Sequence, residues 1–365
     1  MKQFTVIIII IFFASSCSKS HDNINIIPVN PSHAEGSSDN FFVKRHSIAL
    51  ETTEDNLIAK IDKIEMVDNK LYILDKIKKT ISLFDEKGFY LSKINKIGQG
   101  PDEYISISDF AVKDSLIYIL SRDNKKIYIY NNLGVFVRTY ELDDYYDYFY
   151  LREKDLILYS NYSNNKLYNV IIVHLGDNEM IQSNKFLPFI KNQSFLYSPS
   201  PFNVNEQGDL FLCQQFDNNI YSLSQNAITN VCNIEFSTKE KIPVDFEKIG
   251  FAKMCTDYAN KSVVSRISYV VKNNNLLYLL YKFEYNNYLT RVNAKTLAVK
   301  TLKLKHNKNY PFIFCEPLGF YRNHLVGYLS ADNVLLFDGK FYSDKNENKI
   351  LSVFDNPVLF LFQLK

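Results

Sequence analysis

The chain has 365 residues, enough for one large domain or two of ordinary size. Its 42 Lys and Arg are interspersed with 40 Asp and Glu, and the formal net charge is +2. This balance leaves no basic stripe for nucleic acid and no acidic tail for a cationic partner. Phe and Tyr, 28 and 26 in number, far exceed the 11 Gly and 10 Pro, a composition that favours ordered strands over linkers.

The N-terminus has the pattern of an export signal, predicted over residues 1–16. Lys2 precedes an unbroken apolar run from Val6 to Ala14, which is too short to span a bilayer, and two serines then lead to Cys17. The segment resembles a type II lipoprotein signal peptide, although such signals usually have Leu in place of Ala14. The resemblance implies cleavage before Cys17 and acylation of this residue, which anchors a protein in the lipid bilayer without a transmembrane helix. The alternative is an ordinary signal peptide with an incidental Cys.

Residues 17–40 are predicted to be a flexible tether between the lipid and a domain over residues 41–365. They are polar and include Pro28, Pro31 and Gly36, so they cannot bury enough apolar surface to order themselves. One acid, Asp22, lies close to Cys17. In Bacteroidota lipoproteins an acidic cluster after the Cys resembles a surface-export signal. A single acid therefore favours the cell envelope on the periplasmic side of the outer membrane over the cell surface.

An internal repeat determines the predicted fold. Leu71–Leu74 aligns with Ile117–Leu120 at an offset of 46 residues, and at the same offset Lys79 aligns with Lys125 and Gly88 with Gly134. Each unit has a short apolar strand, a polar turn, an alternating strand and a Gly turn into another strand. Several short strands in a period of 40 to 50 residues are typical of β-propellers.

Four weaker copies of the apolar strand follow, at Leu156–Tyr159, Leu210–Leu212, Leu276–Leu280 and Leu325–Tyr328. Six units predict an all-β, six-bladed β-propeller of four-stranded antiparallel blades. The fourth and fifth copies are too far apart for one period, which predicts an insertion near Ser237–Ser262 with a short helix within Val244–Ala259. Such an insertion either lies over one end of the propeller as a functional loop or fills an apolar gap.

The ends of the domain are expected to meet. Val358–Gln363 follows a turn at Asp355–Pro357 and should complete a sheet. An early strand near Ser47–Leu50 is expected to join this last blade, which would close the ring and remove its free edges.

The junction between the first two repeats reads Gly98, Gln99, Gly100, Pro101, Asp102, Glu103, Tyr104. This segment, together with the C-terminal Asp355–Leu359, resembles the six-bladed β-propeller lipoproteins of Bacteroidota, which are related in architecture to NHL-repeat propellers. The resemblance implies an envelope propeller without a shared activity. Both glycines suit positive φ and Pro101 stiffens the exit, which predicts a fixed inter-blade turn. Glu103 and Tyr104 either tie this turn to a neighbouring blade or point into the central channel.

The sequence indicates no metal or redox motif. Its six His are scattered, and C-x-x-C and H-E-x-x-H are absent, which argues against a zinc site. Cys213 and Cys232 lie in the same predicted blade, where they are either cross-strand neighbours that form a disulfide or buried free thiols. Cys255 and Cys315 are the other two cysteines of the exported part.

No catalytic residue is predicted, and G-x-S-x-G is absent. Lactonase-type six-bladed propellers resemble this architecture and hydrolyse esters around a central calcium ion. Oxygens that could hold calcium are those of Asp109, Asp123, Asn161, Asn203 and Asp217, although these residue types are equally expected in turns. A calcium-dependent hydrolase is thus one alternative.

The preferred hypothesis is a membrane-anchored binding protein whose ligand is a glycan, a peptide or an envelope protein, with no resident cofactor. Tyr145, Tyr146 and Tyr148 are the candidate binding residues, unless this Tyr-rich segment is simply an amphipathic strand and turn. A non-catalytic scaffold for envelope complexes is the third possibility.

Overall fold

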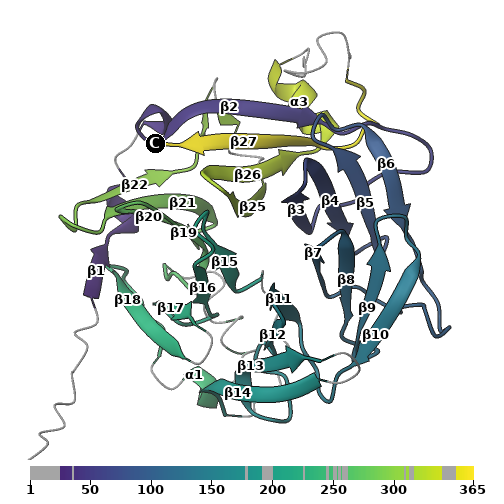
Figure 1. Cartoon of the computed structure of the whole chain (residues 1–365). Coiled ribbons are helices and arrows are strands. Elements are labelled where there is room, and N and C mark those ends of the chain that lie inside the picture. The colour runs from purple at the N-terminus through teal and green to yellow at the C-terminus, as the bar shows by residue number, and fades with distance from the viewer. Residues whose placement is uncertain are drawn as a thin grey trace, which may run out of the picture.

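Six sheets, each with four antiparallel strands, surround a central axis in the computed structural model (Figure 1). The structure describes residues 25–34, 37–176, 180–190, 200–224, 227–243, 246–249, 253, 256, 262–307, 310–311, 316–338 and 351–365. The predicted six-bladed β-propeller is confirmed.

The blades are numbered in chain order. Blade 1 contains β3 (Lys63–Val67), β4 (Lys70–Asp75), β5 (Thr80–Asp85) and β6 (Tyr90–Ile94). Blade 2 contains β7 (Asp109–Lys113), β8 (Leu116–Ser121), β9 (Lys126–Asn131) and β10 (Phe136–Glu141). Blade 3 contains β11 (Tyr148–Arg152), β12 (Asp155–Tyr159), β13 (Tyr168–Leu175) and β14 (Met180–Pro188). Blade 4 contains β15 (Phe202–Val204), β16 (Leu210–Cys213), β17 (Asn219–Leu223) and β18 (Ile228–Phe236). Blade 5 contains β19 (Ile267–Asn273), β20 (Leu276–Phe283), β21 (Asn286–Asn293) and β22 (Val299–Lys303). Blade 6 contains β25 (Glu316–Tyr321), β26 (His324–Leu329), β27 (Val358–Leu364) and, from the other end of the chain, β2 (Phe42–Ala49).

The six apolar segments found in the sequence are the second strands of the six blades. These strands are buried on both faces, since Leu71 and Ile73 of β4 pack toward blade 6 while Tyr72 and Leu74 pack toward blade 2. A buried apolar cluster fills each of the six interfaces between neighbouring blades. Burial on both faces explains why these strands read as continuous apolar runs rather than alternating ones.

The repeat extends to backbone conformation. Lys79 and Lys125, which align at the 46-residue offset, have φ of 55° and 51°, and Gly88 and Gly134 have φ of 90° and 74°. The recurrence of Gly follows from the left-handed conformation of this turn, and the two lysines share a left-handed conformation that their residue type does not favour.

The ring closes as expected. β2 pairs antiparallel with β27, with Ser47 opposite Phe360 and Ala49 opposite Val358, and becomes the outermost strand of blade 6. Phe42 is 2% exposed and contacts Phe362 at a ring-centroid distance of 5.6 Å. The first and last strands of the domain therefore share one sheet.

The predicted flexible tether is wrong for its second half. β1 (Asn25–Val29) pairs in parallel with β18 and gives blade 4 a fifth strand, and Ile27 and Val29 are buried between blades 4 and 5. Two 3-10 helices, η1 (Pro31–His33) and η2 (Ser38–Asn40), continue the chain to β2, and η1 packs against β22. The prediction was based on the polar composition of the segment alone. It failed because the outer edge of β18 has unpaired backbone N–H and C=O groups, and these form hydrogen bonds with an added strand. Residues 1–24, including Cys17, lie outside the described residues.

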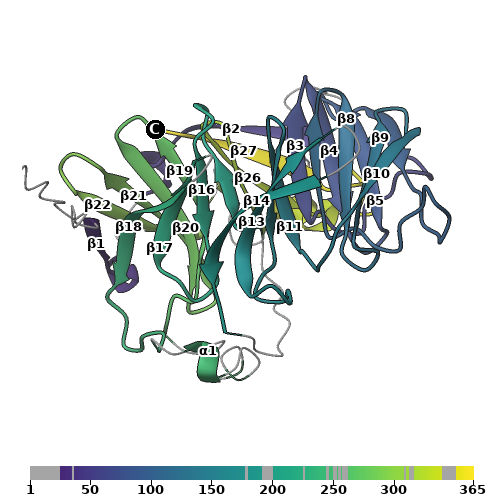
Figure 2. The same cartoon turned by 60° about the horizontal axis from the view of Figure 1, so that its bottom comes forward.

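The insertion after blade 4 contains α1 (Phe246–Ile249), which lies at one end of the propeller (Figure 2). Most of the predicted helix Val244–Ala259 lies outside the described residues. Ile242 and Ile249 pack against Tyr162, Phe189 and Phe216, so this part of the insertion covers an apolar surface of blades 3 and 4.

Further elements were not predicted. α3 (Ala331–Asp338) lies between β26 and β27, where Val334 packs into the cluster between blades 5 and 6. A small hairpin pairs β23 (His306–Asn307) with β24 (Tyr310–Pro311). No helix among the described residues is long and apolar enough to cross a bilayer.

Cys213 and Cys232 are both free and buried, and the idea that they are cross-strand neighbours is wrong. Both lie opposite Ile220, Cys213 on β16 and Cys232 on β18, so β17 separates them. Two inter-strand spacings are about 9 to 10 Å, too far for a disulfide. Cys255 and Cys315 lie outside the described residues.

Candidate functional site

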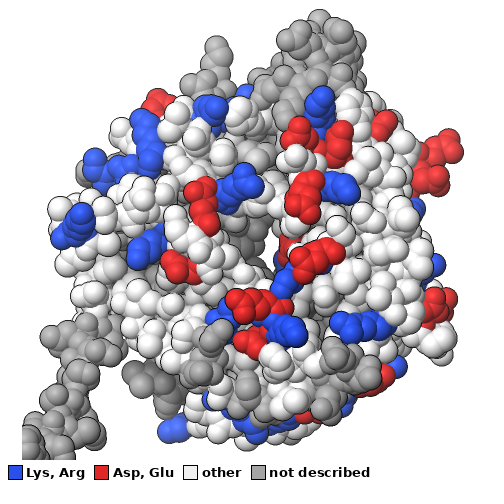
Figure 3. Space-filling view, viewed as in Figure 1, with Lys and Arg blue, Asp and Glu red and all other residues white. Residues whose placement is uncertain are grey.

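The central channel is the candidate functional site. A cavity of about 1540 Å³ is lined by residues of the innermost strand of every blade, β3, β7, β11, β15, β19 and β25. The molecule is visibly hollowed at this point, with acidic and basic side chains around the opening (Figure 3). Because each blade contributes its first strand, side chains far apart in the sequence face one space.

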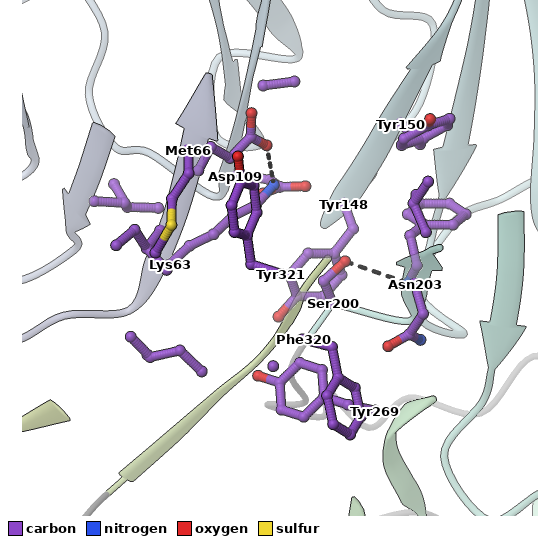
Figure 4. A pocket seen from close by; sticks show the side chains of 18 of the residues that line it. Lys63, Met66, Asp109, Tyr148, Tyr150, Ser200, Asn203, Tyr269, Phe320 and Tyr321 are labelled. Atoms are coloured by element: carbon purple, nitrogen blue, oxygen red, sulfur yellow. Dashed lines mark hydrogen bonds and ion pairs between the residues drawn. The ribbon is translucent and has the colours of Figure 1, made fainter. Parts of the chain in front are cut away.

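A buried ion pair lies on the wall formed by blades 1 and 2. Lys63 Nζ is 2.8 Å from Asp109 Oδ1 and donates a hydrogen bond to the carbonyl oxygen of Phe110 at 2.6 Å (Figure 4). Asp109 is 1% exposed and also accepts hydrogen bonds from the backbone N–H groups of Phe110 and Phe149, at 2.9 and 3.1 Å. The carboxylate thus joins blades 1, 2 and 3.

Glu65 extends this network along β3. Its carboxylate is 3.1 Å from Lys63 Nζ and accepts a hydrogen bond from the Val112 N–H at 2.9 Å. Burial disfavours the charge on Lys63, but the carboxylates of Asp109 and Glu65 outweigh it and raise the pKa of this lysine. Burial raises the pKa of Glu65, and the Lys63 charge offsets part of that effect. Lys63 therefore stays protonated and serves two carboxylates.

The Lys63–Asp109 ion pair could have been predicted from the repeat, although not from the residue types alone. Lys63 and Asp109 are 46 residues apart and occupy the same position, the first residue of the innermost strand, in blades 1 and 2. Opposite charges at equivalent positions of adjacent repeats become neighbours across a blade interface. From its residue type alone, Asp109 is predicted only as a possible calcium ligand.

Lys76 contributes a cation without a counter-ion in contact. The residue lines the channel directly after β4, and its Nζ lies 5.4 Å from the centre of the Tyr148 ring. The amine forms no hydrogen bond or ion pair with any described residue. Burial lowers the pKa of Lys76, while Asp109 and Asp62 offset part of that shift. This half-buried amine can contact an anionic group that enters the channel.

Arg122 occupies the position of Lys76 in the next blade and does have a partner. Its Nε is 2.8 Å from Asp147 Oδ1, and Asn161 donates a hydrogen bond from Nδ2 to Asp147 Oδ2 at 3.2 Å. Burial raises the pKa of Asp147 to about 6, against the favourable charge of Arg122. This carboxyl, 7% exposed, therefore changes its protonation in the pH range just below neutrality.

Aromatic rings line the channel on the other four blades. Half-buried rings from blades 3 to 6 line the channel, namely Tyr150, Phe202, Tyr269, Phe320 and Tyr321. Those of Tyr269 and Phe320 lie across from the Lys63–Asp109 pair (Figure 4). A Cβ on Gly319, where φ is 127°, would lie 3.0 Å from the Tyr269 ring, so glycine is needed both for the backbone and for this ring. The channel thus combines the ion-pair network of blades 1 and 2 with aromatic rings from blades 3 to 6, where Arg152, Glu206, Lys282 and Arg322 also line the cavity.

The three candidate tyrosines have different surroundings. Tyr148 lines the channel under Lys76. Tyr145, three residues earlier, packs against two cations, with Lys125 Nζ 4.2 Å and Arg122 Cζ 4.9 Å from its ring centre. Tyr146 is 1% exposed in the core between blades 2 and 3, so its ring packs there and does not line the channel.

The segment from Gly98 to Tyr104 is an inter-blade turn, but the expected positive φ is wrong for both glycines. A Cβ on Gly98 would lie 1.8 Å from Glu103 Oε2, and the Gly100 N–H donates to the same oxygen at 2.9 Å. The Glu103 carboxylate folds against the backbone here, so a Cβ on Gly98 would displace it, whereas a Cβ on Gly100 would lie 3.1 Å from the same oxygen. Tyr104 is fully buried, and its hydroxyl donates to the Lys79 carbonyl oxygen at 3.1 Å, which ties the turn to blade 1. Pro101 is exposed at the tip.

Each of the proposed calcium oxygens belongs to a residue that has a partner within the protein. Asp109 is paired with Lys63, Asp123 accepts a hydrogen bond from Ser106 Oγ on the surface, and Asn161 contacts Asp147. Asn203 accepts one from the Val270 N–H, and Asp217 accepts one from the Tyr221 hydroxyl. In the part of the chain that the structure describes, no group of three His, Cys, Asp or Glu is placed to hold a metal ion.

Comparison with known proteins gives a family. A family model described as "Domain of unknown function (DUF4934)" matches residues 23–363. The chain belongs to the DUF4934 family. No curated protein matches the sequence.

Solved structures resemble this DUF4934 chain in fold. A candidate exported protein of Bacteroides fragilis has a TM-score of 0.75 and 19% identity, over 93% of this chain and 100% of that one. A DUF4221 family member from Bacteroides vulgatus has a TM-score of 0.55 and 11% identity, over 89% and 97% of the two chains. At these identities the likeness establishes the DUF4934 chain as a propeller and leaves its activity to be argued from the channel.

Proposed function

We propose that this DUF4934 propeller is an exported lipoprotein, acylated at Cys17, that binds an extended peptide with acidic and apolar side chains in its central channel. The observation that carries the proposal is that one channel contains half-buried aromatic rings from blades 3 to 6 and the amine of Lys76, which has no counter-ion among the described residues. Half-exposed rings supply apolar contact area at a low cost in side-chain entropy. A free ammonium group in a partly buried site favours a carboxylate.

The size of the channel favours an oligomeric ligand. Sites for single small molecules have volumes of roughly 300 to 1000 Å³, whereas this cavity has about 1540 Å³. The chain has no Trp, the residue that carbohydrate sites most often use for stacking, which favours a peptide over a glycan. In the Lys63–Asp109–Glu65 network the charge of the lysine neutralises part of the charge of the two carboxylates. We assign this network a structural role, which is to hold the channel wall of blades 1 and 2 in place.

Ligand capture tests the binding proposal. The acylated protein, immobilised in detergent, is incubated with a mixture of envelope-derived peptides and released oligosaccharides, and bound molecules are identified by mass spectrometry. We expect peptides rich in Asp, Glu and apolar residues, and at least a tenfold loss of capture for Tyr269→Ala/Phe320→Ala. Leu133→Ala is the matched control, because Leu133 is 80% exposed on the outer rim. Capture that is unchanged in the channel variant, or capture of oligosaccharides alone, would contradict the proposal.

The anchor has a separate test. Metabolic labelling with a radioactive fatty acid should label the wild-type chain and not Cys17→Ser, and the labelled protein should float with membranes in 1 M salt, since acyl insertion is not screened. A wild-type chain without label would refute anchoring and leave the binding proposal intact.

A further inference from the structure

Blade 5 is unusually basic for a chain with nearly balanced charges. Between Ile267 and Lys303 the sequence has six Lys and Arg and one acid, Glu284, a net charge of +5 where the whole chain has +2. Three of these lysines and the following Lys305 lie on or next to the outermost strand, β22, or its preceding turn. The four residues, Lys295, Lys300, Lys303 and Lys305, are here called the blade 5 rim. Lys303 is half-buried beside Tyr288, and the other three are exposed.

The positive charge of the blade 5 rim is not neutralised locally. None of its four lysines forms an ion pair with a described residue. Basic side chains gather over β21 and β22 on the left of the molecule (Figure 3). Lys44 on β2, the adjoining outer strand of blade 6, is also exposed. Exposed acids do occur nearby. Glu284 of blade 5 accepts a hydrogen bond from Ser262 Oγ, Glu235 on β18 is 3.4 Å from Lys241 Nζ, and Asp39 lies on η2.

The N-terminal segment leaves the propeller beside this rim. β1 is bound to β18 of blade 4, and η1 crosses to β22 of blade 5. Eight peptide units separate Asn25 from Cys17, and even when fully extended they span at most about 29 Å. An anchor at Cys17 therefore keeps the rim of blades 4 and 5 close to the bilayer, with blades 1 and 2 on the far side of the ring.

We infer that the blade 5 rim docks on the anionic headgroups of the membrane in which Cys17 is anchored, so that β1 and the short linker fix the orientation of the propeller. This inference rests on the proposed lipid anchor. Lysines within a Debye length of an anionic surface are attracted to it, over about 10 Å at 0.1 M salt. The anchor at Cys17 holds the propeller close to the bilayer, and the positive charge of the blade 5 rim determines which side of the propeller faces the lipid.

Lysine footprinting on proteoliposomes tests the orientation. The acylated protein is reconstituted in vesicles of phosphatidylcholine with 30% phosphatidylglycerol and, separately, of phosphatidylcholine alone, and is treated with a membrane-impermeant acetylating reagent. We expect the blade 5 rim lysines and Lys44 to be acetylated at least fivefold more slowly on the anionic vesicles. Lys87 and Lys93 of blade 1 are internal controls and should react equally on both. The protection should disappear in 0.5 M NaCl.

A charge variant removes the attraction without touching the core. In Lys295→Gln/Lys300→Gln/Lys303→Gln/Lys305→Gln, Lys44 should react on anionic vesicles as fast as on neutral ones, whereas Lys87→Gln/Lys93→Gln should leave its protection unchanged. Equal acetylation of rim and control lysines on a protein that still floats in 1 M salt would overturn the docking inference alone. Failure to float would overturn the anchor and this inference with it. Protection in native envelopes but not on anionic vesicles would identify a different partner and reject the lipid.

Discussion

Charges in the channel depend on partners from other blades. Asp109 is 1% exposed, and its charge is balanced by a lysine from blade 1 and two backbone donors. Removal of one member of a buried pair leaves the other uncompensated, which costs far more than the pair contributes. The two residues therefore have to be considered together.

We predict that Lys63→Met lowers the free energy of unfolding by about 2 to 4 kcal/mol, because Asp109 and Glu65 lose their cation in a site that excludes much of the water. Urea denaturation measures the change. Lys63→Met/Asp109→Asn should recover part of the loss, since the buried charge is then removed. A single variant within about 0.5 kcal/mol of wild type would show that solvent in the channel screens these charges.

Asp147 makes stability depend on pH. Its pKa of about 6 in the folded chain is above the ordinary 3.8 because burial disfavours the carboxylate. Folded protein therefore binds this proton more tightly than unfolded protein, and the stabilisation is complete below about pH 4 and lost as pH rises to about 6. Relative to Asp147→Asn, the wild-type free energy of unfolding should fall by about 2 to 3 kcal/mol from pH 4 to pH 7. Denaturation at several pH values measures it, and parallel curves for the two proteins would exclude a raised pKa.

Among the elements, the turn from Gly98 to Tyr104 shows how one motif can be assigned correctly for the wrong reason. A fixed inter-blade turn was predictable from its glycines and Pro101. The role of Gly98 was not, because it comes from the Glu103 carboxylate five residues later and not from backbone φ. Only a structure shows that this side chain folds back.

We predict that Gly98→Ala costs about 1 to 2 kcal/mol, because the added Cβ displaces the Glu103 carboxylate from the Gly100 N–H. Glu103→Ala should cost a similar amount, and the double variant little more than either one. Thermal or urea unfolding of the four proteins completes the cycle. Additive losses would show that Gly98 is required for another reason. Gly100→Ala should be milder, since its Cβ would lie 3.1 Å from the same oxygen.

β1 is an element that the local sequence did not predict and that forms through tertiary contacts. The strand is short and includes Pro28, and the polar composition of the surrounding segment 17–40 predicted a tether. The strand forms because β18 offers an unpaired edge and because two of its five side chains, Ile27 and Val29, fit the cluster between blades 4 and 5. Tertiary context overrides local propensity at such edges.

For the whole molecule, stability depends on joining the ends of the chain in blade 6. We predict that Phe42→Ala costs about 3 to 5 kcal/mol, because this ring is buried between blades 5 and 6 beside Phe362. Val43→Ala is the matched control on the same strand; Val43 is 58% exposed, and its loss should cost less than about 1 kcal/mol. Urea denaturation of both compares them. Equal losses would mean that the closing strand contributes little to the ring.

The sequence alone determined the propeller, its number of blades, its closing strands and the repeat of its turns, because these depend on the spacing of apolar strands and on residues that each turn needs locally. The insertion was foreseen as an excess of chain, and its contact with Tyr162 and Phe216 was not. The channel could not be read from the sequence. Lys63, Asp109 and Tyr269 lie on three different blades, and only closure of the ring brings their side chains to one space. The separation of Cys213 from Cys232 by β17 and the binding of β1 to β18 were decided in the same way, because strand order and open edges are properties of the assembled sheets.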